Sequence, residues 1–154
     1  SANIVLSNMY GPHDHFEEKK SHALGALIKK IYDAKLNNSK YVEIWGTGEP
    51  IREWLYVEDG ADALIKCLDL KENSYFFNIG VNKGISVYKM AKIIAQVIDW
   101  DGEFSFDTSK PDGAKEKRVL GEFTEKQFKW SPKVSLEKGI PLTVEWYKNN
   151  ILKI

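Results

Sequence analysis

Short apolar runs alternate with helical patterns along this sequence, and this alternation limits the possible folds more than any other feature. Strands are predicted at residues 2–6, 41–45, 54–57, 74–80 and 103–106. Helices are predicted at residues 22–35, 58–70, 87–98 and 135–150. Alternating strands and helices predict one α/β unit with mixed short strands and about four to five helices.

Local signals refine the limits of these elements. The mostly apolar residues 2–6 predict a strand buried on both faces of a parallel sheet. Ser21 and Ser86 are predicted N-caps of the helices that follow them. Pro141 lies inside the last helical pattern, so we expect a kink or a late start, because proline removes a backbone N–H. Residues 115–118 are basic and are predicted to form a solvated loop or to join a functional site.

Charge and composition restrict the class of ligand. The 154 residues include 22 Lys and Arg and 22 Asp and Glu, so the formal net charge is zero. No broad basic field is available for nucleic acid or a membrane, and an anionic ligand must meet a local cluster. The single Cys67 lies in a helical pattern and predicts a packing role in a reducing, cytoplasmic setting. We expect a soluble protein, because no apolar run is long enough to span a bilayer.

The densest functional signal lies in residues 41–62. An apolar strand leads into a turn with Gly46 and Gly48, and Arg52 follows. Two glycines allow a backbone to approach a ligand closely, and an arginine fork can hold a phosphate through two N–H groups. This stretch therefore predicts the wall of an anion site, with a structural hairpin and a solvated arginine as an equal alternative.

Three histidines lie within ten residues of one another. His13 and His15 flank Asp14 and could hold a divalent metal, but the further ligands of a closed site are missing, so no metal site is predicted. His22 lies at the start of a predicted helix, where the dipole disfavours the protonated imidazole. This position suits a neutral base, and an ordinary surface histidine is the alternative.

Two patterns imitate cofactor motifs. Gly46 and Gly48 follow a strand, as in a dinucleotide-binding fingerprint, but Pro50 and a second strand-like segment stand where the helix should begin. Tyr88 and Lys92 have the spacing of a short-chain dehydrogenase pair, but we expect them to be surface residues.

Several longer motifs occur together. They are NMYGPHD (8–14), SH (21–22), WGTG (45–48), RE (52–53), YVED (56–59), NIG (78–80) and KPDG (110–113). With these motifs the chain resembles the C-terminal portion of an extended short-chain dehydrogenase/reductase in the NAD-dependent epimerase/dehydratase superfamily, and most of all the GDP-L-fucose synthases. The resemblance implies that residues 1–154 are a substrate-binding domain and that an NADP-binding Rossmann domain lies upstream.

The resemblance also implies an activity and the residues that perform it. The full-length enzyme would epimerise C3 and C5 of GDP-4-keto-6-deoxy-D-mannose and then reduce C4 with NADPH. His22 would be the catalytic acid and base. Lys30 and Arg52 would hold the diphosphate, Trp45 would pack on the sugar nucleotide and Asp112 would accept hydrogen bonds from it. The implied cofactor contacts are Leu6, Ser7, Asn8, Met9 and His22.

Other functions remain open at this point. Lys30 replaces the arginine usual in this family and cannot form its bidentate hydrogen bonds to phosphate. The substrate could therefore be another GDP-linked deoxy or heptose sugar. A dehydratase of the same superfamily and a nucleotide-sugar binding module without chemistry are further alternatives. The parent enzyme is expected to be a homodimer, whereas this piece alone could be a monomer that neither holds NADPH firmly nor turns over substrate.

Overall fold

The protein is described by a computed structural model that covers residues 2–17, 20–70 and 75–154. Its α-helices are α1 (Ala23–Leu36), α2 (Val57–Lys66), α3 (Val87–Ile98), α4 (Glu122–Phe128) and α5 (Leu136–Tyr147). Its strands are β1 (Ala2–Leu6), β2 (Asn8–Tyr10), β3 (Tyr41–Trp45), β4 (Ile51–Arg52), β5 (Trp54–Tyr56), β6 (Tyr75–Ile79), β7 (Ile85–Ser86), β8 (Glu103–Asp107) and β9 (Glu116–Lys117). The predicted α/β class with short strands is confirmed.

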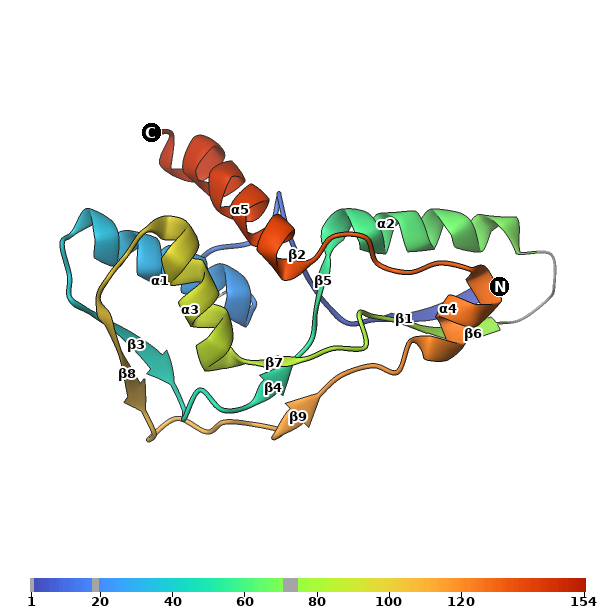
Figure 1. The fold of residues 1–154 in the computed structure, drawn as a ribbon, viewed down its shortest axis with the longest axis horizontal. Coiled ribbons are helices and arrows are strands. Elements are labelled where there is room, and N and C mark those ends of the chain that lie inside the picture. Colours follow the sequence, from blue (N-terminus) through green and yellow to red (C-terminus); the bar gives the residue numbers. More distant parts are fainter. Residues whose placement is uncertain (1, 18–19, 71–74) are drawn as a thin grey trace.

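The strands pair mostly in parallel. β1 pairs with β6, β2 with β5 and β3 with β8, each in parallel. β4 lies between antiparallel β7 and parallel β9. Figure 1 shows an elongated molecule in which α1, α3, β3 and β8 lie at one end, α2, α4, β1 and β6 lie at the other, and β4, β7 and β9 lie between them.

Two hydrophobic clusters hold the two ends. The larger cluster joins the facing sides of α1, α3 and α5, and its fully buried members include Leu24, Ile28, Met90, Ile94 and Ile140. The smaller cluster contains Leu55, Ala63, Ile79 and Trp130. The segment of β4 and β5 runs from one cluster to the other, because Trp54 packs in the first and Leu55 in the second. This segment is therefore the structural link between the two ends.

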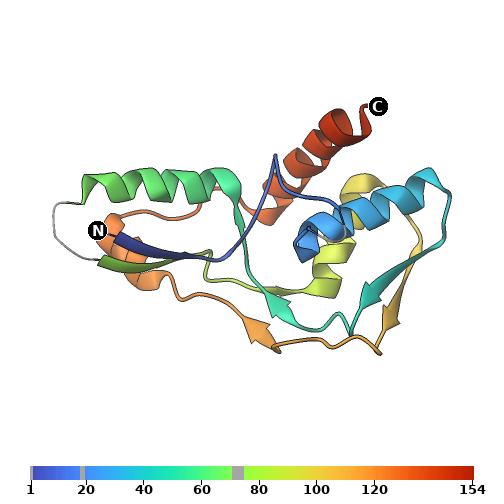
Figure 2. The ribbon, with the colours of Figure 1, turned by 180° about the vertical axis from the view of Figure 1, so that it is seen from behind.

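Within the described residues β1 is partly buried on one face only, whereas the sequence predicts burial on both faces. Ile4 and Leu6 pack against the smaller cluster, whereas Val5 between them is 39% exposed. On the paired strand β6, Ile79 is buried and Phe76 is 67% exposed. Figure 2 shows β1 beside β6 with α2 above both strands. Among the described residues, packing partners cover one face of this pair, so inward and outward side chains alternate.

The predicted helix ends are partly confirmed. Ser86 is the N-cap of α3, and its hydroxyl accepts a hydrogen bond from the Lys89 N–H at 3.2 Å. The predicted N-cap Ser21 is wrong, because α1 begins at Ala23 and its N-cap is His22. Pro141 lies inside α5, so this helix does not start late. Pro141 is only the sixth residue of the helix, so most of its backbone ladder is unaffected.

The sequence predicted neither the short helix α4 nor the short strands β2, β4, β7 and β9. α4 is a seven-residue helix whose length is too short for a clear helical period. β9 lies in the basic segment that was predicted to be a loop, and it becomes a strand because it pairs with β4. Pairing with a strand some 65 residues away cannot be read from two residues, so tertiary contact decides this element.

Cys67 is a free, half-buried cysteine. It follows α2 directly, and its thiol donates a hydrogen bond to the Ala63 carbonyl at 3.1 Å. Partial burial raises the pKa of the Cys67 thiol, which keeps it protonated and unreactive. Within the described ranges, no helix is long and apolar enough to cross a membrane.

Asp59 anchors the connection from α4 to α5. Its buried carboxylate accepts hydrogen bonds from the backbone N–H groups of Lys133 and Val134 at 3.1 and 2.9 Å. These bonds hold the residues before α5 against the first turn of α2. Glu58 lies beside Asp59 in the same helical turn but is exposed.

Replacement of Asp59 should therefore destabilise the fold. Asp59→Ala leaves two N–H groups without an acceptor in a partly buried place, and we expect it to lower the free energy of unfolding by about 2–4 kcal/mol. Glu58→Ala is the matched control, with an expected change within about 1 kcal/mol. Urea unfolding followed by circular dichroism measures both, and equal effects of the two substitutions would contradict the anchoring role.

Candidate functional site

One cavity of about 320 Å³ opens between α1, the end of β3 and strands β4 and β9. Residues that were predicted separately from the sequence come together in its wall, namely Asn8, His22, Lys30, Trp45, Arg52 and Asp112. The predicted cofactor contacts Leu6, Ser7 and Met9 do not line this cavity. The cavity is within the size range of small-molecule sites and is therefore the candidate functional site.

The glycine turn is shaped by Asp112. Thr47 donates two hydrogen bonds to the Asp112 carboxylate, from its N–H at 2.7 Å and from its hydroxyl at 2.8 Å. Gly46 and Gly48 both have left-handed φ angles, of 76° and 73°. A Cβ on Gly46 would lie 2.2 Å from the Asp112 carboxylate, so the absence of a side chain lets Asp112 approach. Gly46 thus brings the backbone close to a carboxylate of the protein itself.

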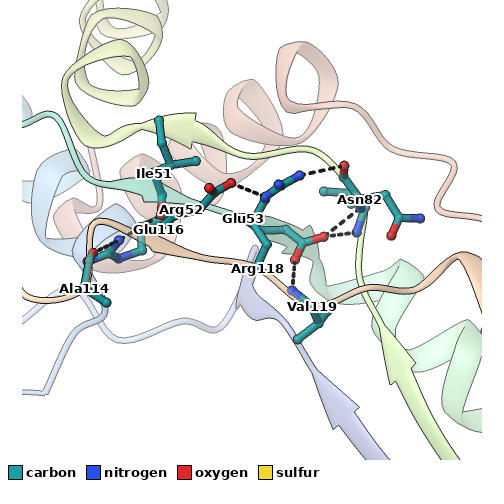
Figure 3. Close-up of polar contacts among 9 residues, drawn as sticks. Ile51, Arg52, Glu53, Asn82, Ala114, Glu116, Arg118 and Val119 are labelled. Atoms are coloured by element: carbon teal, nitrogen blue, oxygen red, sulfur yellow. Dashed lines mark hydrogen bonds and ion pairs between the residues drawn. The ribbon is translucent and has the colours of Figure 1, made fainter.

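Arg52 is held by the loop that carries Asp112. Its guanidinium donates hydrogen bonds to the backbone carbonyls of Ile51 and Ala114, each at 2.8 Å, and of Asp112 at 3.2 Å. Figure 3 shows the bond to Ala114 beside the strands of the site. A guanidinium has five N–H donors, so two remain after these three bonds. Arg52 is therefore a fixed cation that can still bind an anion through two N–H groups, and not a solvated hairpin residue.

The buried carboxylate of Glu53 supports this wall from behind, and its role was not predicted. Glu53 is 1% exposed and accepts hydrogen bonds from the N–H groups of Val81, Asn82 and Val119 at 2.5, 2.7 and 2.8 Å. Figure 3 shows how these bonds tie the chain after β6 and the chain after β9 to one side chain. The only signal in the sequence is an acidic residue directly before the apolar run Trp54–Tyr56. Its partners are 28 to 66 residues away, so the signal could not be interpreted.

Arg118 adds a second link in the same region. It forms an ion pair with Glu116, and its guanidinium lies 3.4 Å from the Asn82 carbonyl. These contacts and those of Glu53 hold β9 beside β4. Lys117, directly opposite Arg52 in the register of the two strands, lines the cavity. The basic segment thus joins the site through Lys117, which was not singled out in the sequence.

Trp45 forms an exposed aromatic surface at another side of the cavity. Its side chain is 54% exposed, although tryptophan is usually mostly buried. The ammonium groups of Lys30 and Lys110 lie over its ring at 4.9 and 5.8 Å from the centroid. Lys30 also donates to the backbone carbonyl of Glu43 at 3.5 Å. The ring and the nearby cations can receive a ligand that is both aromatic and anionic.

His22 and Asn8 lie at the end of the cavity where α1 begins. His22 is exposed and makes no side-chain capping hydrogen bond, so its imidazole is accessible. Asn8 is oriented by a hydrogen bond from its amide to the Glu53 carbonyl at 3.2 Å. Ser7 and Met9 flank Asn8 on the chain. The Ser7 hydroxyl is buried and has no hydrogen-bond partner among the described residues.

The histidine segment and the pair of Tyr88 and Lys92 were also singled out in the sequence. Within the described part of the chain, no cluster of three metal-ligating residues occurs, and the His13 ring packs on Trp146 at 4.8 Å between centroids. Tyr88 is half-buried and contacts Phe106 edge-on, so it is more buried than predicted, whereas Lys92 is exposed as predicted. The Lys92 ammonium lies 4.5 Å from the centre of the Tyr88 ring.

Known proteins resemble this chain closely. A sequence profile of the NAD dependent epimerase/dehydratase family matches residues 1–80. GDP-L-fucose synthase 1 from Arabidopsis thaliana is 37% identical over 145 residues, which are 94% of this chain and 45% of that protein. GDP-L-colitose synthase from Yersinia pseudotuberculosis is 36% identical over 146 residues, which are 94% of this chain and 47% of that protein. The chain thus spans less than half the length of these relatives.

The fold has a counterpart among solved structures. The crystal structure of a GDP-L-fucose synthetase from Naegleria fowleri bound to NADP superposes with a TM-score of 0.88. It is 27% identical in sequence, and the match covers 97% of this chain and 47% of that chain. The arrangement of the described elements is therefore that of a known enzyme structure.

Replacement of Glu53 should loosen the wall of the site. A glutamine has one carbonyl oxygen where the carboxylate has two, so Glu53→Gln leaves at least one of the three N–H groups without an acceptor. We expect a loss of about 1–3 kcal/mol in the free energy of unfolding and faster amide hydrogen exchange at Val119. Glu49→Gln, at an exposed position of the nearby turn, is the control and should change neither value. Unchanged exchange in Glu53→Gln would contradict the supporting role.

Proposed function

Because the chain belongs to the NAD dependent epimerase/dehydratase family, we propose that it is the sugar-nucleotide binding half of an NADP-dependent enzyme that acts on a GDP-linked sugar. The observation that carries the proposal is the meeting of His22, Arg52 and Asp112 in one cavity, although they are distant in the sequence. In this proposal residues 1–154 form the substrate-binding domain, and an NADP-binding domain precedes them in the parent enzyme.

The charges of the cavity favour a diphosphate. Lys30, Arg52 and Lys117 are cations in its wall, and Arg52 and Lys117 are direct neighbours across β4 and β9. Two neighbouring cations can bind two phosphate groups at once, and Arg52 has two N–H groups left for this contact. The exposed ring of Trp45 provides a surface on which the nucleotide packs. The Asp112 carboxylate fixes the turn and faces the same cavity. Its remaining lone pairs can accept hydrogen bonds from hydroxyl groups of the sugar.

The proposed reaction is the epimerisation of GDP-4-keto-6-deoxy-D-mannose at C3 and C5 followed by reduction at C4. Hydrogens next to the C4 ketone are acidic, so His22 can remove a proton at one face and leave an enolate. A second acid, supplied by the upstream part of the enzyme, would return a proton at the opposite face. A neutral imidazole is the form that accepts this proton. General acid–base assistance of this kind contributes roughly 10²–10⁴ in rate.

The nicotinamide would approach from the side of Asn8. Asn8 and His22 line the cavity, and the buried Ser7 hydroxyl has no partner among the described residues, so this segment fits a polar cofactor group. Leu6 and Met9 would complete this border. Bound NADPH supplies the hydride for C4, while the residues of this chain orient the sugar and handle the protons.

A different sugar is a second candidate. The sequence identity to GDP-L-colitose synthase, 36%, is almost the same as that to GDP-L-fucose synthase 1, 37%. Both names contain GDP, so the nucleotide part of the proposal is common to the two candidates. Turnover assays of the full-length protein with NADPH and the two 4-keto sugars distinguish them.

Calorimetric titration of the 154-residue chain with GDP tests the proposal. We expect GDP to bind, and Arg52→Ala to weaken binding at least about 10-fold, since a charged hydrogen bond contributes about 1.5–3 kcal/mol. Arg52 also holds its own loop, so Lys117→Ala provides an independent test, with an expected loss of about 5-fold or more. Lys115→Ala removes a nearby charge outside the cavity wall and should leave binding unchanged. Lack of GDP binding by both the chain and its full-length parent would reject the proposal.

A further inference from the structure

The cavity contains a carboxylate that the protein itself does not use. Its wall includes two acidic residues, Asp112 and Glu43. Both oxygens of Asp112 accept hydrogen bonds from Thr47. Within the described residues, the Glu43 carboxylate accepts no hydrogen bond and pairs with no cation. Glu43 is exposed, so water can solvate its carboxylate. In a site for an anion this charge repels phosphate and favours a ligand group that donates hydrogen bonds.

The position of Glu43 shows which end of a ligand it would meet. Along α1, His22 and Lys30 are eight residues apart, which is about 12 Å along the helix axis. The Lys30 ammonium contacts the Glu43 backbone, so Glu43 lies at the Lys30 end of the cavity and away from His22. The reacting sugar carbon belongs at His22, and the opposite end of a nucleotide sugar is its base.

Glu43 and Trp45 project from the same face of β3. Side chains two residues apart on a strand point in the same direction, and Val42 and Ile44 between them point into the core. The exposed ring of Trp45 and the carboxylate of Glu43 therefore form one continuous surface. An aromatic ring beside a hydrogen-bond acceptor is suited to a flat base that stacks on the ring and donates from its edge.

We infer that Glu43 selects guanine, by accepting hydrogen bonds from the base N1–H and the 2-amino group while Trp45 contacts the base. This inference rests on the proposed function and assigns a specificity-determining residue to the same site. Guanine presents two adjacent donors on this edge, which match the two oxygens of a carboxylate. Adenine presents the acceptor N1 on the corresponding edge, and uracil has a single N–H between two carbonyl groups, so both are repelled in part by Glu43.

Titration of the 154-residue chain with GDP, IDP, ADP and inorganic pyrophosphate tests this assignment. IDP differs from GDP only in lacking the 2-amino group. The wild-type chain should bind GDP more tightly than IDP, and IDP more tightly than ADP. Glu43→Gln should reduce the ratio of GDP to ADP affinity by about 10-fold or more, as for loss of a paired base contact. Pyrophosphate has no base, so its affinity should not fall, and this also reports an intact fold.

Glu49→Gln is the matched control. Glu49 is an exposed acid in the same turn region but does not line this cavity, so its substitution should keep the wild-type ratio. An unchanged ratio in Glu43→Gln, or equal binding of GDP and ADP by the wild type, overturns the assignment of Glu43, while GDP binding that depends on Arg52 still supports the proposed function. If neither the wild-type chain nor its full-length parent binds GDP or pyrophosphate, both the proposed function and this inference fail.

Discussion

The buried carboxylate of Glu53 is the interaction on which the arrangement of the site depends. It lies in the segment that links the two hydrophobic clusters, and it accepts backbone hydrogen bonds from two distant stretches of chain. A buried carboxylate is unfavourable unless its oxygens are satisfied, so the three N–H groups must stay in place. This requirement holds Val119 and therefore β9 beside β4, which brings Lys117 to the side of Arg52.

The functional side chains of the cavity are also parts of its framework. Arg52 donates three hydrogen bonds to backbone carbonyls, and Asp112 accepts two from Thr47. Each of these groups is fixed before a ligand arrives, which reduces the entropy lost on binding. The same bonds mean that substitution of either residue changes the loop as well as the ligand contacts. Lys117 and Glu43 lack such bonds among the described residues, and they report ligand contacts more directly.

Much of the candidate site could be predicted from short sequence motifs, because its residues lie next to recognisable turns. The glycine turn indicated Arg52, and the family resemblance implied Trp45 and Asp112. All three line the cavity together with Lys30 and His22. Leu6, Ser7 and Met9 lie outside it. Ser7 and Met9 are adjacent to Asn8 and point to other sides of an extended chain, and Leu6 packs against the smaller hydrophobic cluster. Glu53 and Lys117 have partners that are distant in sequence, so no local pattern could assign their roles.

The sequence by itself determined the α/β class and most helices and strands, because hydrophobic periodicity and helix caps are local properties. It could not determine that β1 is covered on one face, that β9 is a strand or that His22 replaces Ser21 as the N-cap. Only the tertiary structure decided the first two features, since each depends on which distant segment packs against or pairs with the strand. The same reason explains the cavity, whose wall is formed by segments from Asn8 to Lys117.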